Sequence, residues 1–120
     1  MPDGYTTLVA ALKAITQGEA PNTVTLPMAE NEWNTRPEAE SYGIVTLDYE
    51  TGVLNGDNLK CDTSYEGAVD LFSHSKSGNG WVELIRNVLE TQLGACWSLN
   101  SHMYERETGL FHWEWTFEVI

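Results

Sequence analysis

The residues of this chain best suited to chemistry are its three histidines. His112 and Glu114 lie two positions apart, and His102 precedes Glu105 by three. Imidazole nitrogens and carboxylate oxygens are both zinc ligands, so a metal site can be drawn from these donors. Pairs of donors at this spacing are commonplace, and a solvated polar face explains them better. The sequence therefore predicts no metal site.

Two polar segments resemble fragments of catalytic or phosphate-binding motifs. His74 lies between Ser73 and Ser75, but no Gly-x-Ser-x-Gly elbow surrounds them and no partner acid is indicated. Residues 77–80 read SGNG before a helical pattern, yet they lack the Lys-Ser/Thr of a P-loop and the full GxGxxG spacing. Both segments are predicted to be loop and cap residues, with no catalytic or cofactor-binding role.

Trp113 and Trp115 would form a sugar-stacking platform if both were exposed. They stand in phase with Phe111 and Phe117, which indicates the core or a subunit interface instead. The alternation runs unbroken over residues 110–120 with the period of two that is typical of a strand. This strand is therefore predicted to form one wall of the core. Its other face carries His112, Glu114, Thr116 and Glu118.

Length and composition indicate one globular domain. A chain of 120 residues is long enough to bury a core and too short for two. Its 42% hydrophobic residues exclude an acidic disordered tail. Six basic and eighteen acidic residues give a net charge of −12, which opposes charge-driven binding to nucleic acid or to an anionic membrane.

No apolar run is long enough to span a bilayer, and the first residues lack the basic region of a secretory signal. The sequence therefore indicates a cytoplasmic protein. Its two cysteines, Cys61 and Cys96, are too few for a disulfide scaffold and form no CxxC zinc half-site. Free thiols are favoured in a reducing compartment, and a bridge between the two is the alternative.

Two amphipathic helices are predicted. Residues 6–17 carry apolar side chains at helical spacing and are followed by Gly18, which is placed to end the helix. Residues 81–93 show the stronger pattern, with Ser77 or Asn79 as the cap before them.

Five strands are predicted. Residues 42–49 are rich in strand formers, and residues 50–52 suit a hairpin turn into a second strand at 53–61. A third strand is predicted at 65–72.

The last two strands, residues 96–106 and 110–120, are predicted to form a hairpin around residues 107–109. The order is helix, long loop, three strands, helix, two strands. The predicted fold is therefore α+β in two layers, with two helices covering one face of a mainly antiparallel sheet of about five strands.

The connection at residues 19–41 is the first place to expect a partner. Its three prolines exclude a long helix and a central strand, and leave at most a short extended piece at 23–26. Long loops in small domains are usually functional or mobile. The candidate interaction surface is Trp33, Arg36 and Glu38, with Trp33 as the anchor because a lone loop tryptophan seldom serves a core.

The second half of the chain resembles a known family. A VDLFSHS strand end runs through a polar Gly/Ser loop into an amphipathic helix and an aromatic hairpin. Residues 68–120, together with residues 6–17, are similar in order and pattern to the tail terminator and tail-completion proteins of long-tailed phages and prophages. That family has a shorter connection after its first helix than residues 19–41 provide.

The resemblance implies a subunit of a ring, usually of six copies, that caps the completed tail tube and offers a docking surface to the head connector. It also implies assembly in the bacterial host cytoplasm and a final place in the virion. The acidity suits this role, because attraction between DNA and the inner wall of a ring would retain the strand. Glu114 and Glu118 are the candidates for an acidic lumen or solvent face. Solubility alone explains any single carboxylate nearly as well.

Two other classes of function stay open. An acidic DNA-mimic inhibitor would carry its carboxylates in one continuous exposed stripe, whereas here they are spread through the sequence. A small binding module or enzyme of unrecognised family would show a deep pocket with converging polar groups. The sequence predicts no enzyme activity and no cofactor.

Overall fold

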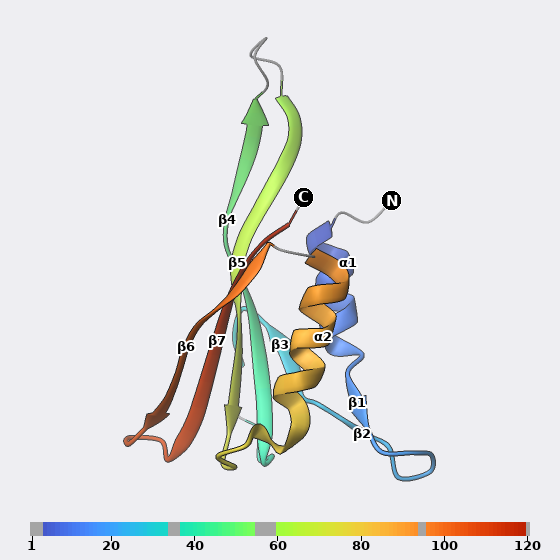
Figure 1. The fold of residues 1–120 in the computed structure, drawn as a ribbon, viewed down its shortest axis with the longest axis vertical. Helices are drawn as coiled ribbons and strands as arrows, with labels where there is room; N and C mark the ends of the chain where they lie inside the picture. Colours follow the sequence, from blue (N-terminus) through green and yellow to red (C-terminus); the bar gives the residue numbers. More distant parts are fainter. Residues whose placement is uncertain (1–3, 34–36, 55–59, 94–95, 120) are drawn as a thin grey trace.

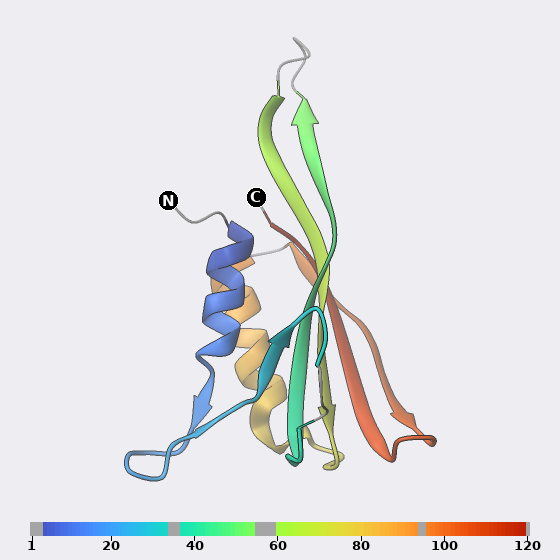
Figure 2. The same ribbon diagram turned by 180° about the vertical axis from the view of Figure 1, so that it is seen from behind.

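The computed structural model describes residues 4–33, 37–54, 60–93 and 96–119, and for residues 49–54 and 60–64 it describes the backbone alone. Over these ranges the order is α1, five strands β1 to β5, the 3-10 turn η1, α2, and the strands β6 and β7. Strands β3 to β7 form one sheet, and both helices lie on the same face of it (Figure 1, Figure 2). The predicted α+β class is confirmed.

The helices form where apolar side chains recur at helical spacing. Helix α1 (Gly4–Lys13) ends earlier than the predicted residue 17, because strand β1 (Thr16–Gln17) leaves it to pair with β2 (Val24–Thr25). Helix α2 (Trp81–Leu93) has the predicted bounds. The 3-10 turn η1 (Gly78–Gly80) leads into α2. Ser77 caps this turn, because its hydroxyl accepts a 3.3 Å hydrogen bond from the backbone N–H of Asn79.

The five-stranded sheet has the order β3-β4-β5-β7-β6. Its members are β3 (Met28–Glu30), β4 (Ser41–Leu54), β5 (Lys60–Ser73), β6 (Trp97–Glu105) and β7 (Leu110–Val119). Only β3 runs parallel to its neighbour, and the other pairings are antiparallel. The predicted hairpin of β6 and β7 is confirmed, and β7 also pairs with β5, so the last strand lies inside the sheet.

The predicted turn at residues 50–52 is wrong, and so is the division of the following segment into two strands. Strand β4 continues through Gly52, which pairs with Thr63 of an unbroken β5. Residues 50–52, whose types suggested a turn, continue the strand beyond a β-bulge that shifts the register between Leu47 and Tyr49. Residues 55–59, which join β4 to β5, lie outside the described residues.

The prediction of an exposed loop at residues 19–41 is wrong in part. The short extended piece predicted at 23–26 contains β2, but the next residues form β3, which pairs with β4, and both Leu26 and Met28 are buried. A strand of three residues is too short to show a period in the sequence. Its backbone hydrogen bonds depend on β4, which follows ten residues later in the chain.

Beyond the bulge, β4 and β5 leave the body of the sheet as a two-stranded ribbon, here called the arm (residues 48–54 and 60–64) (Figure 1). Gly67 lies at its base. A Cβ at this position would lie 2.0 Å from the carbonyl oxygen of Thr46 and 2.9 Å from the ring of Phe117. Only glycine therefore allows the two strands and the β7 aromatic ring to approach this closely.

The core lies between the helices and the aromatic face of β7. Trp113, Trp115, Phe117 and Val119 are buried, as the alternation predicts. They pack in one cluster with apolar side chains of both helices, β4 and β5. Trp115 is fully buried at the centre of this wall.

Because Trp115 fills the centre of the core, Trp115→Ala should lower the free energy of unfolding by about 3–5 kcal/mol through lost burial and a residual cavity. Leu99→Ala is the matched control, since Leu99 is 52% exposed, and it should cost under about 1 kcal/mol. Urea unfolding followed by tryptophan fluorescence and circular dichroism measures both. A cost under about 1 kcal/mol for Trp115→Ala would contradict this placement of the core.

Candidate functional site

The candidate functional site is the face of the sheet opposite the helices, here called the outer face. Side chains that alternate with the core residues of β5 and β7 point to it: Glu66, Ala68, Asp70, Phe72, His112, Glu114, Thr116 and Glu118. The two residues predicted for an acidic lumen or solvent face, Glu114 and Glu118, both lie on it. Glu118 is exposed and Glu114 is half-buried.

Carboxylates face one another across the seam between β5 and β7. The register pairs Glu66 with Glu118 and Asp70 with Glu114. Like charges directly opposite on one face of an antiparallel pair destabilise it, because their Cβ atoms lie about 4.5–5.5 Å apart. Sequence reasoning missed these pairs because each joins two segments far apart in the chain.

One of these carboxylates is compensated by the edge strand. Asn100 is the extra residue of a second bulge, between Leu99 and Ser101 of β6, and its side-chain amide donates a hydrogen bond to Glu114 Oε1. The bulge thus aims an amide at the acidic seam.

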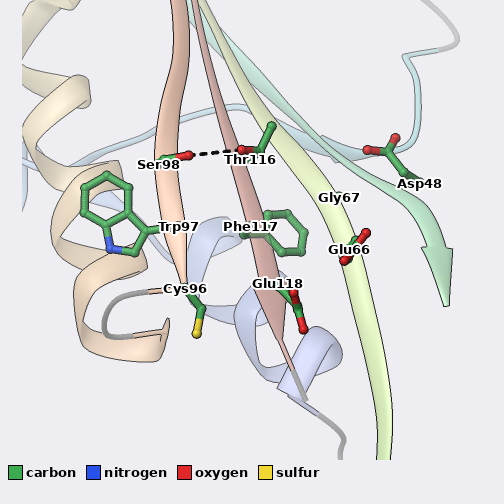
Figure 3. Close-up of a pocket in the computed structure, with 9 residues that line it drawn as sticks. All are labelled: Asp48, Glu66, Gly67, Cys96, Trp97, Ser98, Thr116, Phe117 and Glu118. Atoms are coloured by element: carbon green, nitrogen blue, oxygen red, sulfur yellow. Dashed lines mark hydrogen bonds between the residues drawn. The ribbon is translucent and has the colours of Figure 1, made fainter. Parts of the chain in front are cut away.

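An open hollow of about 490 Å³ lies beside the Glu66–Glu118 pair (Figure 3). Its lining includes the carboxylates of Asp48, Glu66 and Glu118 and the exposed free thiol of Cys96. The free thiol of Cys96 agrees with the favoured prediction, whereas Cys61 lies in the part of β5 whose side chains are not described. In the part of the chain that is described, no group of three or more His, Cys, Asp or Glu side chains is arranged to hold a metal ion.

His112 connects three strands on the outer face. Its Nε2 lies 2.6 Å from Asp70 Oδ1 on β5, and its Nδ1 lies 3.2 Å from Glu105 Oε2 on β6. The hydrogen bond to Asp70 is the largest cause of a raised pKa for His112, burial opposes it, and the charges of both carboxylates add to it. Two carboxylate partners suit the imidazolium, in which both ring nitrogens donate.

The prediction that all three histidines are solvated is therefore wrong for His112, because Asp70 approaches it from a strand that the sequence does not show to be adjacent. Its carboxylate partners are Asp70 and Glu105, whereas the sequence paired it with Glu114. His74 and His102 are exposed as predicted, and His102 stacks on Trp113 with ring centroids 4.3 Å apart.

A row of aromatic rings covers one end of the outer face. Phe72 stacks on His112 and on Tyr42, with centroids 4.3 and 5.2 Å away, and Trp33 meets Tyr42 edge-on at 6.4 Å. The indole N–H of Trp33 donates to the carbonyl oxygen of Gly43 at 3.1 Å. Trp33 is therefore half-buried against its own chain. The sequence predicts instead a loop tryptophan that is available to a partner.

The other two members of the predicted interaction surface lie elsewhere. Glu38 is exposed and lines a hollow of about 470 Å³ with Pro37, Ala39, Glu40 and His74. Arg36 lies outside the described residues. The structure thus places Trp33 and Glu38 in different surroundings, and their role in binding a partner stays a prediction.

No protein-family model and no curated protein sequence matches this chain. The resemblance to tail terminators therefore rests on the order and pattern of its elements. Neither of the two helices described is long and apolar enough to cross a membrane.

The contribution of His112 to stability should depend on pH. Because its pKa is higher in the folded state than the ordinary value of 6.5, the imidazolium stabilises the fold below that value, and this contribution is lost as pH rises through the folded pKa. We expect His112→Gln to cost about 1–3 kcal/mol near pH 5.5 and progressively less above pH 7. Urea unfolding across this range measures it, with the exposed His102→Gln as control. If His112→Gln lowered the free energy of unfolding by the same amount at every pH, His112 would not stabilise the fold as an imidazolium.

The facing carboxylates of Glu66 and Glu118 should lower the free energy of unfolding. Glu66→Gln removes one charge of the Glu66–Glu118 pair and should raise the free energy of unfolding by about 0.2–1 kcal/mol at low salt. The gain should shrink near 1 M salt, where the Debye length falls to about 3 Å. Glu107→Gln, in the exposed turn between β6 and β7, removes the same charge without a facing partner strand and is the control. Destabilisation by Glu66→Gln would show that this carboxylate has a favourable partner instead.

Proposed function

We propose that this chain is a structural subunit of a ring that caps the tail tube of a long-tailed phage or prophage and joins it to the head connector. The observation that supports this beyond the resemblance is the outer face of the sheet, where Glu66 faces Glu118 and Asp70 faces Glu114. In this proposal the outer face lines the ring, and the helices lie behind it.

A face of this kind suits the passage of DNA. Phosphate groups are repelled by carboxylates, so a duplex that moves past them is not retained. Because facing carboxylates oppose stability, their positions are costly for the subunit alone. The passage of DNA through a ring would explain why carboxylates face one another here. Solubility does not explain it, because carboxylates that are spread apart serve solubility equally well.

The proposal has consequences for partners and location. The chain acts as no enzyme and uses no cofactor. Its partners are further copies of itself, the tail tube and the head connector, and Trp33, Arg36 and Glu38 are the candidate interaction surface. The subunit assembles in the bacterial cytoplasm and remains in the virion.

Salt should promote assembly of the isolated protein, because mutual repulsion between subunits of charge −12 opposes ring closure at low ionic strength. We expect sedimentation velocity to show larger species as salt rises from about 0.05 to 1 M, where the Debye length falls below about 5 Å. Negative-stain images of those species should show closed rings.

The resemblance implies that ring subunits of this kind often wait for the tail tip as a template, so solution behaviour is paired with a test in particles. Tail particles should contain the protein, and tails made without it should lack a closed end. Monomers at every salt and concentration, together with its absence from tail particles, would refute the proposal.

A second candidate is a DNA-mimic inhibitor, which is favoured by the gathering of Glu66, Asp70, Glu114 and Glu118 on one face. Against it, Asp70 is held by His112 and Glu114 by Asn100, which leaves fewer carboxylates free to imitate phosphates. A mimic would form a stoichiometric complex with a nucleic-acid-binding protein and would displace DNA from it. A ring subunit would do neither.

A further inference from the structure

We propose that the outer edge of β6 is the surface on which a second copy of this chain docks, by adding a strand of its arm to the sheet. This inference rests on the proposed ring and names the contact between neighbouring subunits. Three features support it: an open apolar edge, an arm that no third strand flanks among the described residues, and the distribution of charge.

Strand β6 is the last strand of the sheet, and no other described strand pairs with its outer edge. The described residues include four large apolar side chains that are exposed, and three of these lie on β6: Leu99 and Met103, each 52% exposed, and Tyr104, 53% exposed. A long edge strand with exposed apolar side chains is a template for another strand.

Among the described strands, none flanks the arm on either side. Strand β3 pairs with β4 only at Gly43–Val45, and β7 pairs with β5 only from Tyr65 to Ser73. Beyond these points, within the described residues, the two arm strands pair only with each other. An isolated two-stranded ribbon is at best marginally stable in water, so the arm needs a further strand or surface beside it.

Length and direction fit a contact between copies. An arm strand of about six residues spans about 20 Å, and the nine residues of β6 span about 30 Å. The arm extends along the long axis of the molecule beyond the helices, whereas β6 runs toward the other end (Figure 1, Figure 2). The arm therefore points away from β6 of its own chain, and a neighbouring copy supplies the edge.

Charge also favours β6. Two copies of charge −12 repel one another, and the seam of β5 and β7 carries four carboxylates in facing pairs. Strand β6 carries one, Glu105, which is held by His112. An approaching acidic copy thus meets less repulsion at this edge than at that seam.

The arm and the β6 edge are different surfaces, so the contact is head-to-tail. Such contacts build rings when the rotation between copies closes and open filaments when it does not. Each subunit in the ring would donate one arm and accept one.

The edge is tested with Leu99→Glu, which places a carboxylate on an exposed position of β6 without disturbing the buried core. Val24→Glu is the matched control, because Val24 is also exposed, at 57%, and the variant has the same net charge. Under the salt conditions that assemble the wild type, we expect Leu99→Glu to need at least about tenfold more protein to assemble, and Val24→Glu to behave as the wild type. Tyr104→Glu is an independent second edge variant, and circular dichroism checks that all are folded.

The arm is tested by replacing residues 52–63 with Asn-Gly, which closes the hairpin near the body. This variant keeps its β6 edge, and Leu99→Glu keeps its arm. At the concentration that assembles the wild type, each should be monomeric alone. An equimolar mixture should form one-to-one dimers and stop there, because the dimer has used the single working arm and the single working edge.

The outcomes separate this inference from the proposed function. If the wild type forms rings and the edge and arm variants do so as well, the inference fails and the ring stands. If the mixture gives dimers but the wild type forms open chains, the contact stands and the ring fails. A wild type that stays monomeric in every condition overturns this inference, and its absence from tail particles as well would overturn the ring.

Discussion

The antiparallel register of β5 with β7 is the constraint on which the rest of the structure depends. It joins the two halves of the chain and brings Trp115 opposite Val69, on the face that the helices cover. Because side chains alternate, the same register aligns Glu66 with Glu118 on the other face. A shift by one residue would expose the aromatic wall and bury the carboxylates. The hydrophobic core therefore enforces the acidic seam.

The sequence predicted those elements whose residue pattern repeats within a short segment of the chain. The aromatic strand, helix α2 and the turn at residues 107–109 follow from spacing within a few residues. Strand β3 could not be found this way, because three residues carry no period and their hydrogen bonds come from β4. The length of β4 could not be found either, because residues 50–52 have the types of a turn, whereas their pairing with β5 continues the strand.

The candidate site was less predictable than the fold, because its contacts are non-local. Glu114 and Glu118 could be assigned to one polar face from alternation, but the strand that faces them could not. His112 illustrates the difference: its neighbour in sequence is Glu114, whereas its partners Asp70 and Glu105 come from two other strands. A charge held between two carboxylates offsets part of the repulsion that the register creates. The outer face thus combines the cluster around His112 with a second facing pair of carboxylates beside the hollow.

The base of the arm determines what an assembly of this chain can look like. The bulge at Asp48 and the close approach at Gly67 set the direction in which β4 and β5 leave the sheet. In a head-to-tail contact, that direction fixes the rotation from one copy to the next, and the rotation decides between a ring and a filament. A side chain at Gly67 would force Thr46 and Phe117 apart and so redirect the arm. Gly67, which permits this close approach, is therefore also a residue on which closure of the proposed ring depends.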